Sequence, residues 1–269
     1  MKKFCLILLF LCGAGSLFAE EATEDLPPVP EVSLPFPMGE TLTYNIYWGI
    51  IGVGESKATT SWIWQEDRWL IRIRFRTRSN GVLAKLYPVD DVVDTLIDPV
   101  TYRPVSHVLD LQEGKHQRNA QTIFNWDRMQ AVYTKAHEDK EDEVKTIPLE
   151  EESGDLVSFM YFLRDTTFEE NKSYDFEVLS DYKMYDLTVK TAGVDKIHLA
   201  DYGKTKSLKL IPEAKFEGVF VSDGKIELWL SDDERRLLTK LELDTPFANV
   251  KLLLKSVEGP GADDWKKKD

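Results

Sequence analysis

Apolar and polar residues alternate along much of this chain, and that period of two limits the possible folds more than any other feature. The alternation is clearest at residues 42–48, 69–76, 226–230 and 237–244. Successive side chains of a strand point to opposite faces, so the pattern predicts strands with one packed face. Short turn-forming sequences, such as Glu113-Gly114, separate these stretches. We therefore predict a mainly β fold, in which curved antiparallel sheets form an open barrel or a sandwich.

One segment departs from this period and indicates a helix. The helical spacing i, i+3, i+4 and i+7 occurs at Leu156, Phe159, Met160 and Leu163. Ser153 or Asp155 can cap the first turn of such a helix. We expect one short central helix at about residues 155–164. It would either plug the open end of a curved sheet or join two β lobes that meet near residues 150–170.

The first nineteen residues have the plan of a secretory signal peptide. A basic start at Lys2 and Lys3 precedes an apolar run from Phe4 to Cys12, and the small residue Ala19 stands before the expected cut. The apolar run is shorter than the roughly 20 residues that cross a bilayer. We predict export to the periplasm. A lipoprotein cut at Cys12 is disfavoured, because Leu11 stands where lipidation needs a small residue.

Loss of residues 1–19 changes the chemistry that the chain can carry. It would leave 250 of the 269 residues, and the loss of Lys2 and Lys3 changes the formal charge of −13 to −15. Both cysteines, Cys5 and Cys12, would go as well. The mature protein would then have no disulfide, no thiolate nucleophile and no thiolate metal site. Its acidic charge argues against nucleic-acid binding, which needs an excess of Lys and Arg.

The mature chain divides into three parts by composition. Residues 20–37 are acidic and proline-rich, which predicts an extended tether. Residues 38–258 carry the strand patterns and form the β-rich domain. Residues 259–269 indicate a flexible tail.

Charges interrupt many of the candidate strands, whereas an outer-membrane barrel keeps one face of each strand apolar. We therefore do not expect an integral membrane protein.

A row of arginines is the most specific physical feature of the sequence. Arg72, Arg74, Arg76 and Arg78 share one strand face, about 7 Å apart by the two-residue repeat. Such a row of guanidinium groups can bind the phosphate or carboxylate groups of a lipid or glycan. The interpretation that we favour is pairing with acidic residues of neighbouring strands, for example Glu55.

Two tryptophans supply a second candidate binding feature. Trp62 and Trp64 share a strand face, following Ala58 and Thr60. If this face lines a concave sheet, the two side chains form an apolar groove for a ligand. Packing in the core of a curved sheet is the favoured alternative. Trp62 and Trp64 join the four arginines as the candidate ligand-binding residues.

No catalytic or metal-binding motif is recognisable in the chain. It has no Gly-x-Ser-x-Gly, His-Glu-x-x-His or Walker sequence. His107 and His116 are the one pair that a hairpin at Glu113-Gly114 can bring together, and no carboxylate is placed beside them by spacing. Paired acids that a glycosidase-like hydrolase needs occur at Asp90, Asp91, Asp232 and Asp233. We expect no enzyme, no cofactor and no metal.

Several short motifs together resemble a family of exported bacterial proteins, the domain of unknown function DUF3108. The motifs are, in chain order, Gly39-Glu40-x-Leu42-x-Tyr44-x-Ile46-x-Trp48-Gly49, the glycines Gly52 and Gly54, Tyr87-Pro88-Val89-Asp90-Asp91, Arg103-Pro104, Asp155-x-x-Ser158-x-x-Tyr161-x-Leu163-Arg164 and Leu228-Trp229-Leu230-Ser231-Asp232-Asp233-x-Arg235-Arg236. The resemblance covers about Met38 to Val257. It implies a periplasmic β-rich protein and supplies no catalytic residue or ligand.

From these features we expect a non-catalytic periplasmic protein that binds or carries an amphiphilic envelope ligand, a lipid or a glycan. The strand pattern, the aromatic residues and the arginine row support this function. One alternative is a structural or assembly factor that binds another envelope protein, which the tether and an acidic loop at residues 137–143 favour. A second alternative is an envelope hydrolase that uses paired carboxylates.

Overall fold

The computed structural model describes residues 26–81, 83–216, 219–220, 225–244 and 249–267. The first strands are β1 (Thr41–Trp48), β2 (Ile51–Gln65), β3 (Arg68–Ser79), β4 (Asp90–Ile97), β5 (Pro104–Glu113), β6 (His116–Asn125), β7 (Gln130–Lys135) and β8 (Glu143–Pro148). The later strands are β9 (Ser153–Asp155), β10 (Ser173–Ser180), β11 (Lys183–Leu199), β12 (Gly203–Phe216), β13 (Val219–Phe220), β14 (Lys225–Ser231), β15 (Leu238–Asp244) and β16 (Asn249–Glu258). The signal peptide predicted at residues 1–19 lies outside the described residues.

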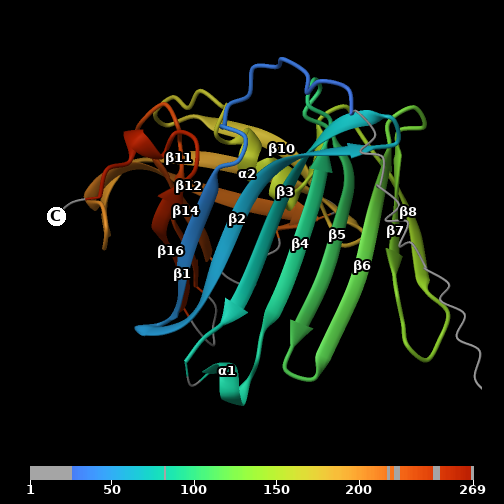
Figure 1. The fold of residues 1–269 in the computed structure, drawn as a ribbon, viewed down its shortest axis with the longest axis horizontal. Helices are drawn as coiled ribbons and strands as arrows, with labels where there is room; N and C mark the ends of the chain where they lie inside the picture. The colour runs from blue at the N-terminus through green and yellow to red at the C-terminus, as the bar shows by residue number, and fades with distance from the viewer. Residues whose placement is uncertain (1–25, 82, 217–218, 221–224, 245–248, 268–269) are drawn as a thin grey trace, which may run out of the picture.

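These strands form one sheet with the order β8-β7-β6-β5-β4-β3-β2-β1-β16-β15-β14-β12-β11-β10-β9, and β13 pairs with β12. The sheet is strongly curved, and the strands β1 to β6 stand side by side along one wall (Figure 1). Strand β1 pairs with β16, which joins the two ends of the domain. Pairing is antiparallel except between β9 and β10. The predicted mainly β fold with an open, curved, antiparallel sheet is confirmed.

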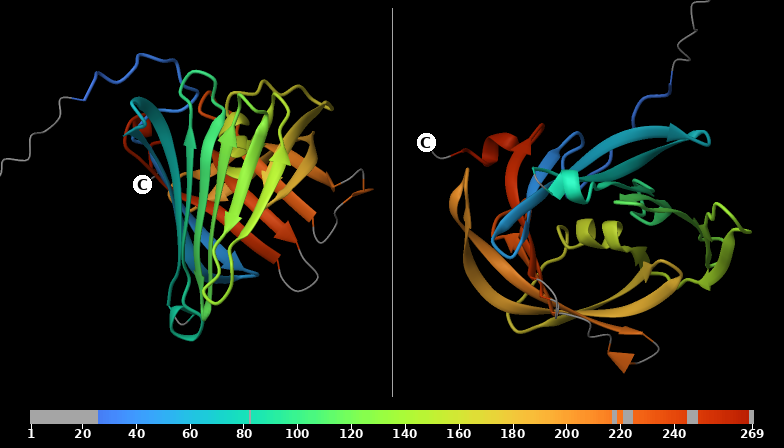
Figure 2. Two further views of the ribbon diagram at one scale, coloured as in Figure 1. Left: turned by 90° about the vertical axis from the view of Figure 1, so that its right-hand side faces the viewer. Right: turned by 90° about the horizontal axis from the view of Figure 1, so that it is seen from below.

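The predicted central helix is present as α2 (Leu156–Phe162), and the sheet curls around it (Figure 2). Asp155 caps its first turn by accepting hydrogen bonds from the backbone N–H groups of Val157 and Ser158. The buried side of the helix differs from the expected one. Leu156 is exposed, whereas Val157 and Tyr161 are buried. A helix inside a curved sheet is covered on more than one side, so its apolar residues do not form a single stripe.

Two further short helical turns were not expected from the sequence. They are α1 (Leu83–Leu86) and the 3-10 helix η1 (Ala262–Asp264). Each is about one turn long, too short to leave a periodic apolar pattern. None of the helices in the described ranges is long and apolar enough to cross a membrane.

The rolled sheet closes by side-chain contacts, which we call the seam. The end strands β8 and β9 of the described sheet do not pair with each other. Instead, an apolar cluster joins Phe124 of β6 and Tyr133 of β7 to Leu179 of β10. An ion pair between Arg118 of β6 and Asp181, in the turn after β10, also crosses the seam. Within the described residues no backbone hydrogen bonds join these two edges, so the sheet is open in its pairing and closed by side-chain packing.

Both predicted flexible ends contain packed residues. In the predicted tether, Phe36 is 3% exposed and packs in a cluster with Ile71, Ile73 and Tyr161. In the predicted tail, Trp265 is 8% exposed, and its Nε1 donates to Asp233 at 3.1 Å. The prolines and charges around these residues indicated extended chain. A single large aromatic ring is enough to dock such a segment, because it buries a large apolar surface.

Candidate ligand-binding site

A narrow apolar space, which we call the slot, lies inside the rolled sheet beside α2. Its apolar walls come from Leu42 and Ala58 of β1 and β2, Met160 and Leu163 of the helical segment, and Leu228 and Leu241 of β14 and β15. Strand register explains this grouping. Leu42 faces Ala58 across one strand pair, and Leu228 faces Leu241 across another. Alternation then points each pair to the same, inner face.

The slot is small as the side chains stand. The space between its walls is about 450 Å³ when the part open to solvent is included. The cavity itself has a volume of only about 30 Å³. A ligand larger than a few waters therefore needs the walls to move apart. Three residues of the lining, Phe75, Met160 and Leu241, are only half-buried, and a methionine side chain adapts easily to a new shape.

Two tyrosines and one arginine supply the polar part of the lining. Tyr44, Tyr161 and Arg164 line the slot together with the apolar residues. The hydroxyl of Tyr161 is buried and has no hydrogen-bond partner in the described structure. Burial raises the pKa of Tyr161 and of Tyr44 far above the usual value, so both phenols stay neutral. An unpartnered buried hydroxyl is unfavourable, which makes it a candidate contact for a ligand.

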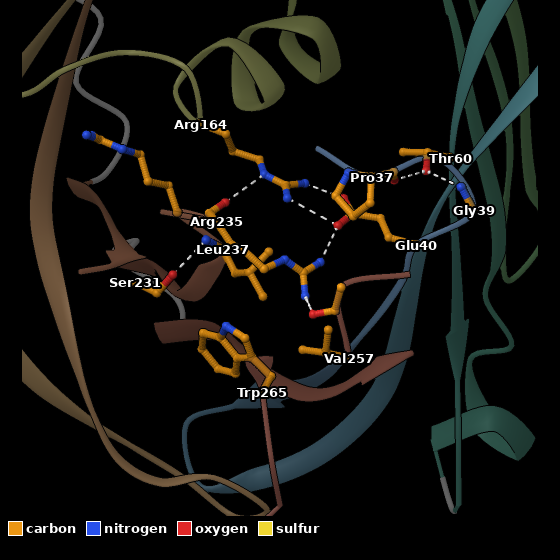
Figure 3. A network of polar contacts seen from close by, with 12 residues as sticks. Pro37, Gly39, Glu40, Thr60, Arg164, Ser231, Arg235, Leu237, Val257 and Trp265 are labelled. Carbon is orange, nitrogen blue, oxygen red and sulfur yellow. Dashed lines mark hydrogen bonds and ion pairs between the residues drawn. The ribbon is translucent and has the colours of Figure 1, made fainter. Parts of the chain in front are cut away.

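Arg164 belongs to a buried ion cluster, which consists of Glu40, Arg164 and Arg235 (Figure 3). Arg164 contacts both carboxylate oxygens of Glu40, with Nη2 at 3.1 Å from Oε2. Nη2 of Arg235 lies 2.7 Å from the same Oε2. Burial lowers the pKa of Arg164, but the hydrogen bond and charge of Glu40 outweigh this and raise it. Both guanidinium groups therefore share one carboxylate inside the fold.

The three members of the cluster come from segments far apart in the sequence. Glu40 precedes β1, where Gly39 has a left-handed φ of 84° and donates its N–H to Thr60 O at 3.1 Å. Arg164 follows α2, and its Nε donates to the carbonyl of Arg235 at 3.1 Å. Arg235 lies in the turn between β14 and β15, which Asp233 shapes by accepting from its backbone N–H.

Glu40, Arg164 and Arg235 are not among the site residues that we predicted from the sequence. A signal for them was nevertheless present, because all three lie in the motifs that carry the family resemblance, as do Tyr44 and Tyr161. The fold brings these separate motifs to one place around the slot and the ion cluster. Only the topology, in which β1 pairs with β16 and α2 fills the interior, reveals that they meet.

The arginine row is paired with two carboxylates of β4. Arg72 and Arg74 bind Asp94, and Arg76 and Arg78 bind Asp90, at N···O distances from 2.5 to 3.1 Å. The intervening residues Ile71 and Ile73 are buried, so the arginines lie on the outer face, away from the slot. Hydrogen bonds from Arg76 and Arg78 hold the pKa of Asp90 well below its usual range. The structure thus shows the cross-strand pairing that we favoured, although Glu55 pairs with Lys255 instead.

The two candidate tryptophans lie near the start of the described chain, outside the slot. Trp62 packs beside the cluster that contains Phe36. Trp64 makes an edge-to-face contact with Trp69, with ring centroids 5.4 Å apart. Trp69 Nε1 in turn donates to Pro27 O at 2.9 Å. These rings therefore dock the N-terminal segment onto β2 and β3.

His107 and His116, which a hairpin at Glu113-Gly114 could have brought together, do not pair. In the β5–β6 register His107 faces Thr122, and His116 faces Glu113. No group of three or more His, Cys, Asp or Glu within the described ranges is placed to hold a metal ion. Three of the four candidate hydrolase acids make structural side-chain contacts. Asp90 binds arginines, Asp91 accepts from the backbone N–H of Gln112, and Asp233 holds the turn before β15.

His107 instead takes part in a buried polar contact across the seam. Its Nδ1 lies 3.2 Å from Asp155 Oδ1 and 2.8 Å from Thr95 Oγ1. Thr95 Oγ1 also donates to Asp155 at 3.0 Å. Burial raises the pKa of Asp155, but the contact with His107 and the hydrogen bonds from Ser158 outweigh it and lower the pKa. The charged carboxylate thus links β4 and β5 to the start of α2.

This arrangement predicts a stability term that is lost in acid. A carboxylate with a lowered folded pKa stabilises the fold above its unfolded pKa of about 3.9 and stops doing so as the pH falls through the folded value. We expect the melting temperature of the wild type to exceed that of Asp155→Asn at pH 6, and the difference to shrink as the pH falls below about 4. Thermal melts followed by circular dichroism measure this. An equal difference at every pH would contradict the assignment.

Comparisons with known proteins agree with the fold. A family model described as "Protein of unknown function (DUF3108)" matches residues 43–255. Among solved structures, the "Crystal Structure of Beta-barrel-like Protein of Domain of Unknown Function DUF1849 from Brucella abortus" matches with a TM-score of 0.56 and 11% sequence identity. The match covers 83% of this chain and 98% of that one. At this identity the likeness concerns the fold alone. The comparison with curated proteins gave no match.

Proposed function

Because this chain belongs to the DUF3108 family, whose function is unknown, its function has to be inferred from its own interior, and we propose that it binds an amphiphile without catalysis. The apolar chain of the ligand lies in the slot. The protein works in the periplasm, where the signal peptide predicted at residues 1–19 would deliver it. It holds or carries an envelope lipid there.

The observation that carries this proposal is the composition of the slot walls. Leucines of β1, β14 and β15 surround it together with Met160, and the hydroxyl of Tyr161 on the same lining has no hydrogen-bond partner among the described residues. Ligand sites are typically apolar concavities with few polar groups that orient the ligand. The small volume of the slot favours a slender linear chain over a bulky ring. The outer arginine row has no part in this function, since it lies on the face of β3 away from the slot and is paired with Asp90 and Asp94.

Filling the slot should weaken binding strongly. We expect Ala58→Leu to weaken the binding of 1-tetradecanol and of tetradecanoate at least ~10-fold, about 1.4 kcal/mol, because the new side chain occupies the path of the apolar chain. Native mass spectrometry and the quenching of tryptophan fluorescence measure the affinity. Ala58 is 1% exposed, so the substitution also crowds the core.

Ala131→Leu is the matched control. Ala131 is 0% exposed in β7 and belongs to the separate cluster at the seam. The same substitution there crowds the core to a similar degree and leaves the slot open. We expect this variant to bind as the wild type does. If Ala58→Leu also binds as the wild type does, or if both variants lose binding equally, the slot is not the binding site.

A further inference from the structure

The ion cluster at the slot carries an unbalanced positive charge. Two guanidinium groups, those of Arg164 and Arg235, share the single carboxylate of Glu40. The side chain of Arg164 is 4% exposed, that of Arg235 is 11% exposed and that of Glu40 is 0% exposed. Asp233, which lies near Arg235 in the same turn, accepts instead from the hydroxyl of Ser231, from backbone N–H groups and from Trp265. The described contacts therefore leave one net positive charge in the interior.

This charge lies at the slot itself. Arg164 is part of the lining, next to Tyr161. The guanidinium carbon of Arg164 stands 5.4 Å from the centre of the Tyr161 ring and 5.6 Å from that of Phe36. The two rings fix the position of the guanidinium group. The unpartnered hydroxyl of Tyr161 is thus close to the positive cluster, where it can donate to a negatively charged oxygen.

An anion is the ligand group that satisfies both features. In a medium of low polarity, an unbalanced charge interacts strongly with a charge of opposite sign. A hydroxyl that donates to an ionised oxygen forms a stronger hydrogen bond than one between neutral groups. A neutral head group would leave the positive charge unbalanced, and a cationic head group would be repelled by it.

We propose that the slot selects amphiphiles whose head group is an anion, a carboxylate or a phosphate. The anionic oxygen is placed between the Tyr161 hydroxyl and the Arg164 end of the ion cluster, and the apolar chain runs along the leucine walls. This inference rests on the proposed function, since it assigns the head group of the same ligand. Because carboxylate and phosphate share this chemistry, the experiment must separate them.

The test compares four probes that share one apolar chain, namely tetradecanoate, tetradecyl phosphate, 1-tetradecanol and tetradecylammonium. Binding to the whole protein is measured by native mass spectrometry and calorimetry, below the concentration at which the probes form micelles. We expect one or both anions to bind at least ~10-fold more tightly than the alcohol, a difference of about 1.4 kcal/mol. We expect the ammonium to bind most weakly. The tighter of the two anions identifies the head group.

Two variants connect this preference to the site. Tyr161→Phe should reduce the advantage of the anion over the alcohol several-fold, because the lost hydrogen bond weakens the binding of the anion more than that of the alcohol. Tyr133→Phe is the control, because it removes a buried tyrosine hydroxyl at the seam and not at the slot. If all four probes bind equally, the anion preference is overturned and the proposed function stands. If no probe binds, the proposed function fails as well.

Discussion

Replacing Glu40 by glutamine should destabilise the protein by about 3–5 kcal/mol, because it leaves two buried guanidinium groups without a counter-charge. Glu40 is 0% exposed and contacts both Arg164 and Arg235. Glutamine keeps the shape of the side chain but loses its charge. The expected result is a large fall in the midpoint of urea unfolding, followed by tryptophan fluorescence.

Asp90→Asn is the matched comparison for this variant. Asp90 also bridges two arginines, Arg76 and Arg78, but its side chain is 38% exposed. Exposed ion pairs typically contribute ~1 kcal/mol or less. We expect Asp90→Asn to shift the free energy of unfolding by no more than that. Equal effects of the two substitutions would mean that the ion cluster is not a buried structural element.

Replacing Phe36 by alanine is the second change with a large expected effect. Phe36 is 3% exposed. Its ring lies edge-to-face against that of Tyr161, with the ring centroids 4.8 Å apart, and the guanidinium group of Arg164 lies over it. Loss of a buried phenylalanine ring costs about 3–5 kcal/mol. We therefore expect a fall of that size in the free energy of unfolding, again measured in urea.

The control for Phe36 lies in the same segment. Val29 is 41% exposed, so Val29→Ala should change the stability by less than about 0.5 kcal/mol, as exposed substitutions usually do. A similarly small effect of Phe36→Ala would show that residues 26–37 behave as the extended tether that the sequence predicts. A large effect would instead show that the segment is part of the domain and holds the rings around Arg164 in place.

The fold class could be predicted because its cause is local. The alternation at residues 42–48 becomes β1, and that at residues 69–76 falls within β3. The spacing around Phe159 and Met160 becomes α2. Each pattern needs only the direction of successive side chains. The order of strands in the sheet and the position of the helix inside the roll depend on contacts between distant segments, which local patterns do not contain.

The candidate site was harder to predict for the same reason. The arginines from Arg72 to Arg78 could be recognised as a row because they stand at every second position of one strand. In the fold, however, the row lies on the outer face and is paired with Asp90 and Asp94 of β4. The ion cluster is built from residues far apart in the sequence, Glu40, Arg164 and Arg235. The motifs that contain them implied no function for them. The three residues became a cluster only through the pairing of β1 with β16 and the turn between β14 and β15.

The most direct test of the central claim is photo-crosslinking with tetradecanoate that carries a diazirine at the end of its chain. The protein is irradiated with the bound probe, digested and sequenced by mass spectrometry. We predict that the adducts lie on slot residues such as Met160, Leu228 or Leu241. Adducts confined to exposed apolar residues such as Ile50, Ile51 or Leu86 would contradict binding inside the rolled sheet.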